Sequence, residues 1–349
     1  MNLLDLNKHS ISHRATLRAA LEKLLLLGTD LTLFVVNDNG QLVGTLTDGD
    51  SRRGLLNGLQ ISDVVEKFMR LDFFFVKSDY KLEDILIAKR QSIRVLPIID
   101  QNNRIIKLIN FEFLYSSLPV DAFILAGGEG IRLRPLTENI PKPMLKIGSK
   151  PILEHCINLL MRYGIDNIQI SVNYLGNMII DYFKDGSDHG VNISYVTEET
   201  KLGTIGSISL AKDFVNDYVL IMNSDLLTNI NLEDFFIEFQ NADADISIAA
   251  IPYTVNVPYA ILDTDDNRVL GLKEKPSITY YSNAGIYLIK KKHLKRIINN
   301  SFLNATDLIT DMITDKMKVI YYPLLDYWLD IGKHEDFAKA TNDIKYIKI

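Results

Sequence analysis

The sequence is poor in cysteine, in long apolar runs and in metal-type histidine patterns, and each shortage excludes a class of protein. Its 349 residues include one cysteine, Cys156, so no intramolecular disulfide can form and a cysteine zinc site has no second ligand. The six histidines show no ligand spacing, so no zinc is expected. No apolar run approaches the roughly 20 residues of a membrane span. Residues 1–8 lack the basic and apolar segments of a signal peptide.

An excess of positive charge is also absent. The formal net charge is −6, which gives no basic surface for nucleic acid or an anionic membrane. The 47% apolar and 23% charged residues are typical of a globular protein. The length allows two domains, each with its own core. We therefore expect a cytoplasmic protein that binds neither nucleic acid nor membranes, and any phosphate site must draw on locally placed positive charge.

An internal repeat occupies the first third of the chain. Residues 33–44 match residues 96–107 at an offset of 63, and each copy has the pattern of a strand, an Asx/Gly turn and a second strand. Each copy follows a helical pattern, at 16–27 and at 81–88. Two related units in tandem predict a pseudo-symmetric pair packed face to face.

A change of pattern at Ser116–Pro119 predicts a domain boundary, giving domains of 1–118 and 119–349. Beyond it, strands and helices alternate, which predicts an α/β domain with a mainly parallel sheet. The expected strands are 122–126, 167–172, 192–196, 218–222 and 246–252. The expected helices are 152–163, 178–183, 206–211 and 232–241.

The stretch from Leu125 to Leu145 carries the clearest chemistry. An apolar run leads into a glycine-rich turn, whose small residues let backbone N–H groups approach anionic oxygens closely. Arg132 and Lys142 add fixed positive charge beside it. The stretch lacks the Gly-Lys-Ser/Thr ending of a kinase-type P-loop, and the acidic ribose partner of a dinucleotide fold is also missing. It therefore indicates a nucleoside-triphosphate site, against the alternative of a tight turn with no ligand.

Six motifs in a fixed order resemble the sugar-phosphate nucleotidyltransferase, or nucleotide-sugar pyrophosphorylase, family. They are the glycine-rich opening at 125–145, Gly203–Gly206, Asp225, Glu274–Pro276, Asn283–Tyr287 and Trp328–Asp330. The resemblance implies a Rossmann-like, mainly parallel mixed sheet. It also implies a reaction in which a sugar 1-phosphate oxygen attacks the α-phosphorus of a nucleoside triphosphate and expels pyrophosphate.

The form of residues 132–145 is most similar to guanylyltransferases that act on mannose, heptose or glucosamine 1-phosphate, in the synthesis of surface-glycan precursors. This implies GTP, with thymidylyl or uridylyl transfer to a hexose 1-phosphate as the alternative. Tyr259-Ala260 stands where the family often has Tyr-Gly, which affects the expected sugar pocket. Ser224 stands where the family usually has Gly, which leaves the neighbouring Asp225 in place.

The resemblance assigns residues in three groups. Arg132 would stabilise the departing pyrophosphate and Lys142 would neutralise the triphosphate. The implied nucleotide contacts are Leu125, Gly127, Gly128, Gly130, Gly203 and Thr204, with a plain helix cap as the alternative for Thr204. The implied sugar-phosphate contacts are Glu274, Lys275, Asn283 and Gly285, with a surface ion pair as the alternative for the Glu-Lys pair. Asp225 and Asp330 would hold Mg²⁺, since hard oxygen ligands suit that ion, although a lone strand-end Asp is more often a turn former or cap.

The first repeat continues into Thr47 and Asp50, which resemble the ribose-binding residues of CBS domains. The resemblance implies an α+β, regulatory CBS-domain pair that takes an adenine nucleotide and favours a homo-oligomer, whereas the plain alternative is a turn and helix N-cap at Asp50. In the second copy, the positions aligned with Gly44, Thr47 and Asp50 are Lys107, Asn110 and Phe113, which depart from the pattern. A hypothesis from another class is a non-catalytic nucleotide sensor with a degenerate transferase domain.

Overall fold

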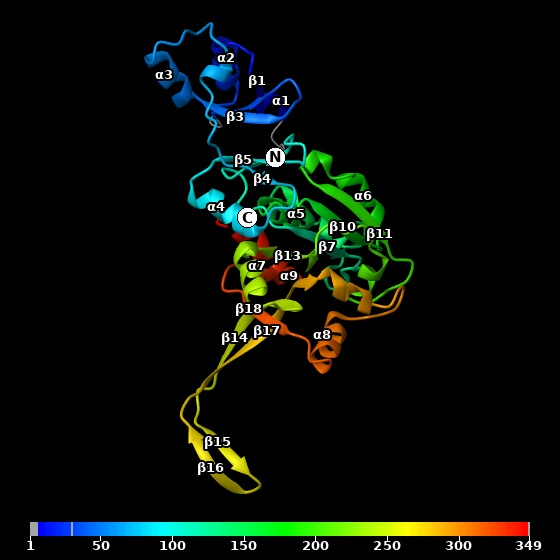
Figure 1. Cartoon of the computed structure of the whole chain (residues 1–349). Coiled ribbons are helices and arrows are strands. Elements are labelled where there is room, and N and C mark those ends of the chain that lie inside the picture. The colour runs from blue at the N-terminus through cyan, green and yellow to red at the C-terminus, as the bar shows by residue number, and fades with distance from the viewer. Residues whose placement is uncertain (1–5, 29–30, 348–349) are drawn as a thin grey trace. The chain divides into compact units, whose positions relative to one another are not determined.

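The chain divides into two compact units in the structure, a computed structural model that describes residues 6–28 and 31–347 (Figure 1). The first unit comprises residues 1–119 and 162–164, and the second comprises 120–161 and 165–349. Among the residues that are described, no helix is long and apolar enough to cross a membrane.

The first unit contains two three-stranded sheets built on the same plan. Their strand orders are β1-β2-β3 and β4-β5-β6. The strands are β1 (Ser10–Ser12), β2 (Thr32–Val36), β3 (Leu42–Thr47), β4 (Val76–Lys77), β5 (Val95–Ile99) and β6 (Ile105–Asn110). The hairpins β2–β3 and β5–β6 keep the same pairing register at an offset of 63, and each has an irregularity at the same place, Val35/Val36 and Ile98/Ile99. The predicted hairpin repeat is confirmed.

The hairpin turns are also equivalent. Asn37 Oδ1 accepts hydrogen bonds from the backbone N–H groups two and four residues on, both at 3.0 Å. Asp100 Oδ1 does the same at 2.8 Å. The two copies share one apolar cluster, as the predicted pairing requires. Its buried members are Phe34, Leu42, Val95, Ile99 and Leu108.

The helices of the first unit follow the repeat only in part. The first is a single turn, α1 (Leu6–His9), and α2 (Leu17–Leu26) and α4 (Leu82–Arg90) each precede a hairpin, close to the predicted ranges. After β3 the chain enters α3 (Asp48–Leu56), whereas the described residues after β6 form turns. The two copies therefore differ at the place where the first carries Thr47 and Asp50.

The second unit is built on a seven-stranded sheet with the order β11-β10-β7-β12-β17-β14-β18. Its strands are β7 (Val120–Ala126), β10 (Asn167–Val172), β11 (Asn192–Thr197), β12 (Tyr218–Asn223), β14 (Ile246–Asn256), β17 (Ser277–Lys290) and β18 (Val319–Pro323). Only β17 runs antiparallel to its neighbours in this sheet. The sheet is therefore mainly parallel and mixed, as predicted.

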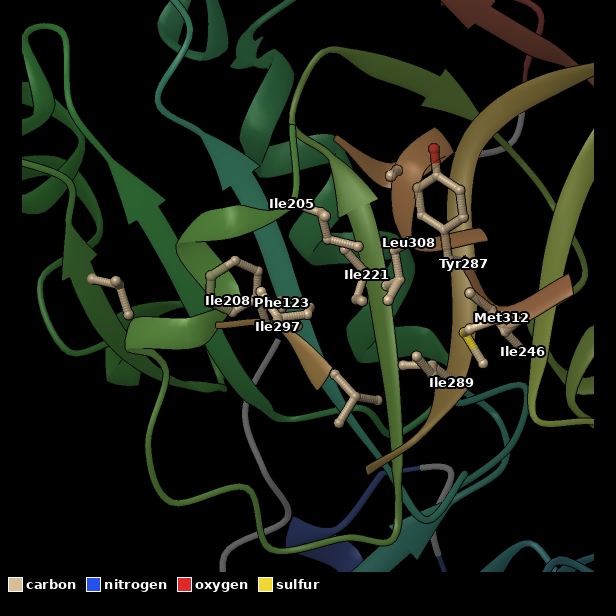
Figure 2. Close-up of a cluster of buried hydrophobic side chains, with 13 residues drawn as sticks. Phe123, Ile205, Ile208, Ile221, Ile246, Tyr287, Ile289, Ile297, Leu308 and Met312 are labelled. Atoms are coloured by element: carbon tan, nitrogen blue, oxygen red, sulfur yellow. The ribbon is translucent and has the colours of Figure 1, made fainter. Parts of the chain in front are cut away.

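Apolar side chains of this sheet form a core cluster with residues of α8 and neighbouring segments. Figure 2 shows Phe123, Ile221 and Ile289, from three neighbouring strands, close to Leu308 and Met312 of α8 (Ala305–Thr314). All of these side chains are fully or almost fully buried. Burial of this kind stabilises by roughly 1.5–3 kcal/mol for each large side chain, so the sheet is a rigid base for the loops at its strand ends.

The other helices of the second unit lie near the predicted positions. They are α5 (Ile152–Arg162), α6 (Gly176–Phe183), α7 (Leu232–Asn241) and α9 (His334–Asp343). The predicted helix 206–211 is wrong in type, because Gly206–Leu210 forms a 3₁₀ helix. The backbone N–H groups of Ile205 and Gly206 both donate to the Leu303 carbonyl, at 3.1 and 3.2 Å, so this tertiary contact replaces a longer helical ladder.

A two-stranded ribbon continues from the sheet beyond the predicted end of its strand. β14 runs four residues past 252 and pairs with β17 as far as Asn256 and Ser277. The hairpin of β15 (Ile261–Asp265) and β16 (Arg268–Lys273) follows at the end of this ribbon, as Figure 1 shows in yellow. We call residues 251–282 the arm.

Candidate active site

A short antiparallel ladder brings the two predicted metal ligands together. β13 (Leu226–Thr228) pairs with β19 (Trp328–Asp330), so Leu226 lies opposite Asp330, and the Ile331 N–H donates to the Asp225 carbonyl at 3.0 Å. An apolar cluster that includes Leu227 and Ile331 lies in the same region and fixes the ladder. Two aspartates far apart in sequence thus become neighbours.

The glycine-rich loop follows β7 and turns into a short 3₁₀ helix, Ile131–Leu133. Gly130 has a φ of +62°, and a Cβ there would lie 3.0 Å from both Lys142 Cβ and Thr137 Cγ2. The Thr137 hydroxyl donates to the Gly130 carbonyl at 2.8 Å. Glycine is needed at this position for both conformation and space, and the close packing places Lys142 directly beside the loop.

The Lys142 ammonium lies between the two aspartates. It forms an ion pair with Asp225, and its Nζ is 3.7 Å from Asp330 Oδ1. Lys142 is itself buried, so the pair is weakly screened by water. The Arg132 guanidinium lies against Gly332, where a Cβ would be 3.3 Å from Nη2. The predicted cations and carboxylates therefore converge on one place.

Two carboxylate oxygens at this place lack a hydrogen-bond partner among the described residues. Asp225 Oδ1 and Asp330 Oδ1 are both buried and unsatisfied. Burial, followed by the nearby charge of Asp225, raises the pKa of Asp330, and the charges of Lys142 and Arg132 oppose that rise. Adjacent buried acceptors of this kind fit a divalent cation.

The composition of the donor set favours magnesium over a protein-caged metal. No group of three or more His, Cys, Asp or Glu side chains that could hold a metal occurs in the described part of the chain. Mg²⁺ is commonly held by one or two carboxylates, with phosphate oxygens and water completing its shell. Asp225 and Asp330 are therefore sufficient protein ligands if a polyphosphate binds beside them.

A cavity of about 600 Å³ opens beside these residues. Its lining includes all six predicted nucleotide contacts together with Arg132, Lys142 and Asp225. It also includes residues to which sequence reasoning gave no role: Ser171, Glu198, Lys201, Asn223 and Phe302. The volume lies in the range of small-molecule and cofactor sites.

Glu198 is the most informative of the unpredicted residues. A Cβ on Gly127 would lie 2.9 Å from Glu198 Oε1, so the carboxyl group lies against the glycine-rich loop. Burial raises its pKa. The usable sequence signal is an acidic residue at the end of strand β11, a few residues before Gly203.

Gly203 and Thr204 line the cavity but also have structural roles. Gly203 has a φ of +81°, and a Cβ there would lie 2.5 Å from the Leu303 carbonyl oxygen. The Thr204 hydroxyl accepts a hydrogen bond from the Ala305 N–H at 2.9 Å, at the start of α8. Thr204 does not cap the 3₁₀ helix that follows it, whose N-cap is Ile205 with no side-chain hydrogen bond; its hydroxyl instead accepts from the first N–H of α8.

The predicted sugar-phosphate residues fall into two groups. Asn283 and Gly285 lie on β17 near the cavity: a Cβ on Gly285 would lie 2.5 Å from Nδ2 of Asn223, which lines it. Asn283 donates to the Tyr287 hydroxyl at 2.9 Å. Glu274 and Lys275 lie on the arm between β16 and β17, are exposed, and do not line the cavity of their own chain.

The predicted ribose contacts of the first unit form a capping box at the start of α3. Asp50 Oδ2 accepts from the Thr47 N–H at 2.9 Å and from the Thr47 hydroxyl at 2.6 Å, and Asp50 also pairs with Arg53. A capping contact of the same kind, from the Lys81 N–H to Asp84 at 2.9 Å, occurs at the start of α4, which precedes the second hairpin and is not the counterpart of α3. Ribose binding at Thr47 and Asp50 stays a prediction.

The fold and this cavity define a nucleotide-handling α/β enzyme site, and comparison with known proteins gives the family. The Nucleotidyl transferase family profile matches residues 121–346, so the chain belongs to this family. The solved structure of HddC from Yersinia pseudotuberculosis is similar, with a TM-score of 0.51 and 29% identity over 64% of this chain and 99% of that one. The same protein in complex with GMP-PN gives 0.50 and 27%, with the same coverage.

Curated relatives include enzymes for several nucleotides and sugars. The chain is 32% identical to a mannose-1-phosphate guanylyltransferase of Mycobacterium tuberculosis, over 64% of each chain. It is 35% identical to a bifunctional GlmU protein of Methanocaldococcus jannaschii, over 64% of this chain and 53% of that one. It is 32% identical to a D-glycero-alpha-D-manno-heptose 1-phosphate guanylyltransferase of Aneurinibacillus thermoaerophilus, over 65% and 99%. The chain thus spans about half to two thirds of the length of several of these relatives.

Proposed function

We propose that the second unit transfers a nucleoside monophosphate from a nucleoside triphosphate to a sugar 1-phosphate and releases pyrophosphate. The observation that supports this most is the convergence of the glycine-rich loop, Arg132, Lys142 and Asp225 on one cavity, with Asp330 Oδ1 3.7 Å from the Lys142 Nζ. Two polyanions must meet for this reaction, so fixed positive charge and close backbone approach are the main needs of the site.

Different groups of the chain act on different parts of the substrates. Backbone N–H groups of the loop containing Gly127, Gly128 and Gly130 orient the triphosphate. Arg132 and Lys142 neutralise its charge, so that a sugar 1-phosphate oxygen can bond to the α-phosphorus as the bond to the β-phosphate oxygen breaks. The leaving pyrophosphate carries the electron pair and is stabilised by Arg132. Asp225 and Asp330 would hold Mg²⁺, which when bound supplies Lewis-acid charge neutralisation to the phosphates.

GTP is the proposed donor. Guanine presents two adjacent N–H donors, on N1 and N2, and an ionised carboxylate is an acceptor only; Glu198 in the cavity wall matches that edge. Two of the curated relatives are guanylyltransferases, which supports the same donor. The alternative is uridylyl or thymidylyl transfer, because a UTP–glucose-1-phosphate uridylyltransferase of Synechocystis is 30% identical over 65% of each chain.

A panel assay tests this proposal. Pyrophosphate release is measured with GTP, UTP, dTTP and ATP against mannose, heptose, glucose and glucosamine 1-phosphates, with Mg²⁺ present. We expect release that requires both substrates and is fastest with GTP. A faster reaction with UTP or dTTP would identify that nucleotide, and not GTP, as the donor. No pyrophosphate release with any pair would favour the non-catalytic nucleotide sensor instead.

We also propose that the first unit is a regulatory CBS-type pair that binds an adenine nucleotide at Thr47 and Asp50. The hairpin repeat with its shared register and shared core supports a duplicated module. The difference between the copies after β3 and β6 supports a single site per pair.

A further inference from the structure

The arm exposes an apolar face that its own chain leaves uncovered. Tyr253 lies directly opposite Tyr280, and Val255 opposite Ile278. Directly opposed residues, and residues two apart, share a face of a two-stranded ribbon. The four side chains therefore form one apolar face, with Tyr253 62% and Tyr280 58% exposed.

The β15–β16 hairpin at the end of the arm also exposes apolar side chains. Leu262 and Leu272 are paired across β15 and β16 and are 51% and 60% exposed, and Val269 is also exposed. β15 and β16 pair only with each other among the described strands. A lone two-stranded hairpin is at best marginally stable in water, and several large apolar side chains exposed together indicate a binding surface.

The arm also carries residues that a sugar-phosphate site needs. Glu274 and Lys275 belong to it, yet no residue between 226 and 301 lines the catalytic cavity. The cavity of one chain is thus lined by the predicted nucleotide contacts, and no residue of the arm lines it. This step rests on the proposed function, since it takes Lys275 as a sugar-phosphate contact.

The arm's construction argues against its folding back onto its own cavity. From Ala250–Asn283 to Asn256–Ser277 the β14–β17 pairing is continuous, and the one irregularity, at Ile248/Ala250, lies at the base. Extended chain from Ala250 to Asn256 spans roughly 20 Å at about 3.3 Å per residue. Over this stretch the ribbon would have to break several pairs to reverse direction.

We propose that the arm is exchanged with a second copy of this chain, so that the arm of each protomer completes the sugar-phosphate side of its partner's cavity. The exchange would be reciprocal, and it would bury the Tyr253–Tyr280 face against the other protomer. Swapping an identical element between protomers is a low-cost route to a two-fold dimer, and it explains why the arm is both long and apolar.

Mixing two inactive variants tests the exchange. Asp225→Asn removes the cavity chemistry and keeps the arm, whereas Glu274→Ala/Lys275→Ala keeps the cavity and disables the arm. Each variant alone should be inactive. Co-expressed in equal amounts, they should recover about a quarter of wild-type pyrophosphate release, because half of random dimers are mixed and one of their two sites is intact. No recovery, or full activity of the arm variant alone, would overturn the exchange while leaving the proposed function in place if the wild type is active.

A cross-linking experiment gives a readout that does not depend on activity. A photoreactive phenylalanine at Tyr280 in the full chain should give a covalent dimer on a denaturing gel, with the cross-link to residues 120–349 of the other copy. The same group at Leu325, 80% exposed on the same unit, is the matched control and should give none. Cross-links confined to one chain, or the absence of a dimer band specific to Tyr280, would contradict the exchange even if the wild type proved inactive.

Discussion

Lys142 sets the charge balance of the site. Without it, Asp225 and Asp330 would be two half-buried carboxylates next to each other, an arrangement that like-charge repulsion disfavours. The Lys142 ammonium pairs with Asp225 and lies 3.7 Å from Asp330 Oδ1, while Asp225 Oδ1 and Asp330 Oδ1 have no hydrogen-bond partner among the described residues. The residue thus holds the two carboxylates together and leaves these two oxygens available to a cation.

The first residue-scale prediction concerns Asp225. Asp225→Asn should reduce pyrophosphate release by at least about 100-fold, since the loss of several kcal/mol of charge stabilisation corresponds to two or more powers of ten in rate. The fold should persist, as circular dichroism and the melting temperature would show. Asp311→Asn, at an exposed position of α8, is the matched control and should retain wild-type activity. Near-normal turnover of Asp225→Asn would refute the metal role.

Glu198 carries a prediction about base choice. Glu198→Gln replaces one of two carboxylate acceptors by an N–H₂ donor, which suits the alternating donor and acceptor edge of uracil or thymine better than guanine. We expect kcat/KM for GTP to fall by roughly tenfold or more, since a mismatched buried polar pair costs about 1–3 kcal/mol. Competition between GTP and UTP measures the change. An unaltered ratio would show that Glu198 does not contact the base.

The same side chain predicts a pH dependence. Burial raises the pKa of Glu198, and only its ionised form accepts two hydrogen bonds. As pH falls through that raised pKa, KM for GTP should rise, approaching about tenfold per pH unit. The Glu198→Gln variant has no titrating group there, so its KM should be flat over the same range. If KM for GTP depended on pH in the same way in the wild type and in Glu198→Gln, Glu198 would be excluded as the cause of that dependence.

At the scale of elements, the site depends on glycines that let two segments meet. The Gly203–Gly206 turn packs against residues 301–303, where any Cβ at Gly203 meets a backbone carbonyl that cannot move aside. Gly128 differs, because a Cβ there meets no atom within 4 Å. Packing therefore requires glycine at position 203 of this cavity and does not require it at position 128.

This contrast gives a matched pair of variants. Gly203→Ala should lower the free energy of unfolding by about 2–3 kcal/mol, through a strained positive φ and overpacking. Gly128→Ala should change it by less than about 0.5 kcal/mol. Urea unfolding monitored by fluorescence measures both. Equal stability of the two variants would contradict the packing described for Gly203.

The elements also show where sequence reasoning succeeds and where it fails. Buried strands such as β7 and β12 are predictable because their apolar runs stop at turn-forming residues. The 3₁₀ helix at Gly206–Leu210 is not, because its hydrogen bonding is set by Leu303, far along the chain. The β13–β19 ladder is only three residues long on each side and has no local pattern. Asp225 and Asp330 were therefore identified by motif, and their adjacency required the fold.

At the scale of the whole molecule, a repeat of hairpins is joined in one chain to a transferase domain. The repeat was predictable, since matching segments 63 residues apart specify the same register and the same turn. The length of the arm was not, because Pro252, a residue type that usually lies at the end or edge of a strand, lies inside β14. Composition alone gave no sign of the exposed apolar face of the arm.

The last prediction concerns the first unit. Asp50→Ala should abolish adenine-nucleotide binding, measured by calorimetric titration of the full chain with AMP and ATP. The variant also loses a helix cap, which costs about 1 kcal/mol. Asp84→Ala removes a capping contact of the same kind at the start of α4 and should bind as the wild type does. Equal affinity of all three proteins, or no binding by the wild type, would remove the proposed site.

Cys156 has a practical consequence for the molecule as a whole. Its thiol is 2% exposed, donates to the Leu226 carbonyl at 3.3 Å, and has a pKa that burial raises to about 12. At neutral pH it is therefore a poor nucleophile and a poor target for oxidants. A single cysteine introduced on the surface would be the only thiol able to react. The arm or either unit can thus carry one spectroscopic label at a chosen position without the removal of any native residue.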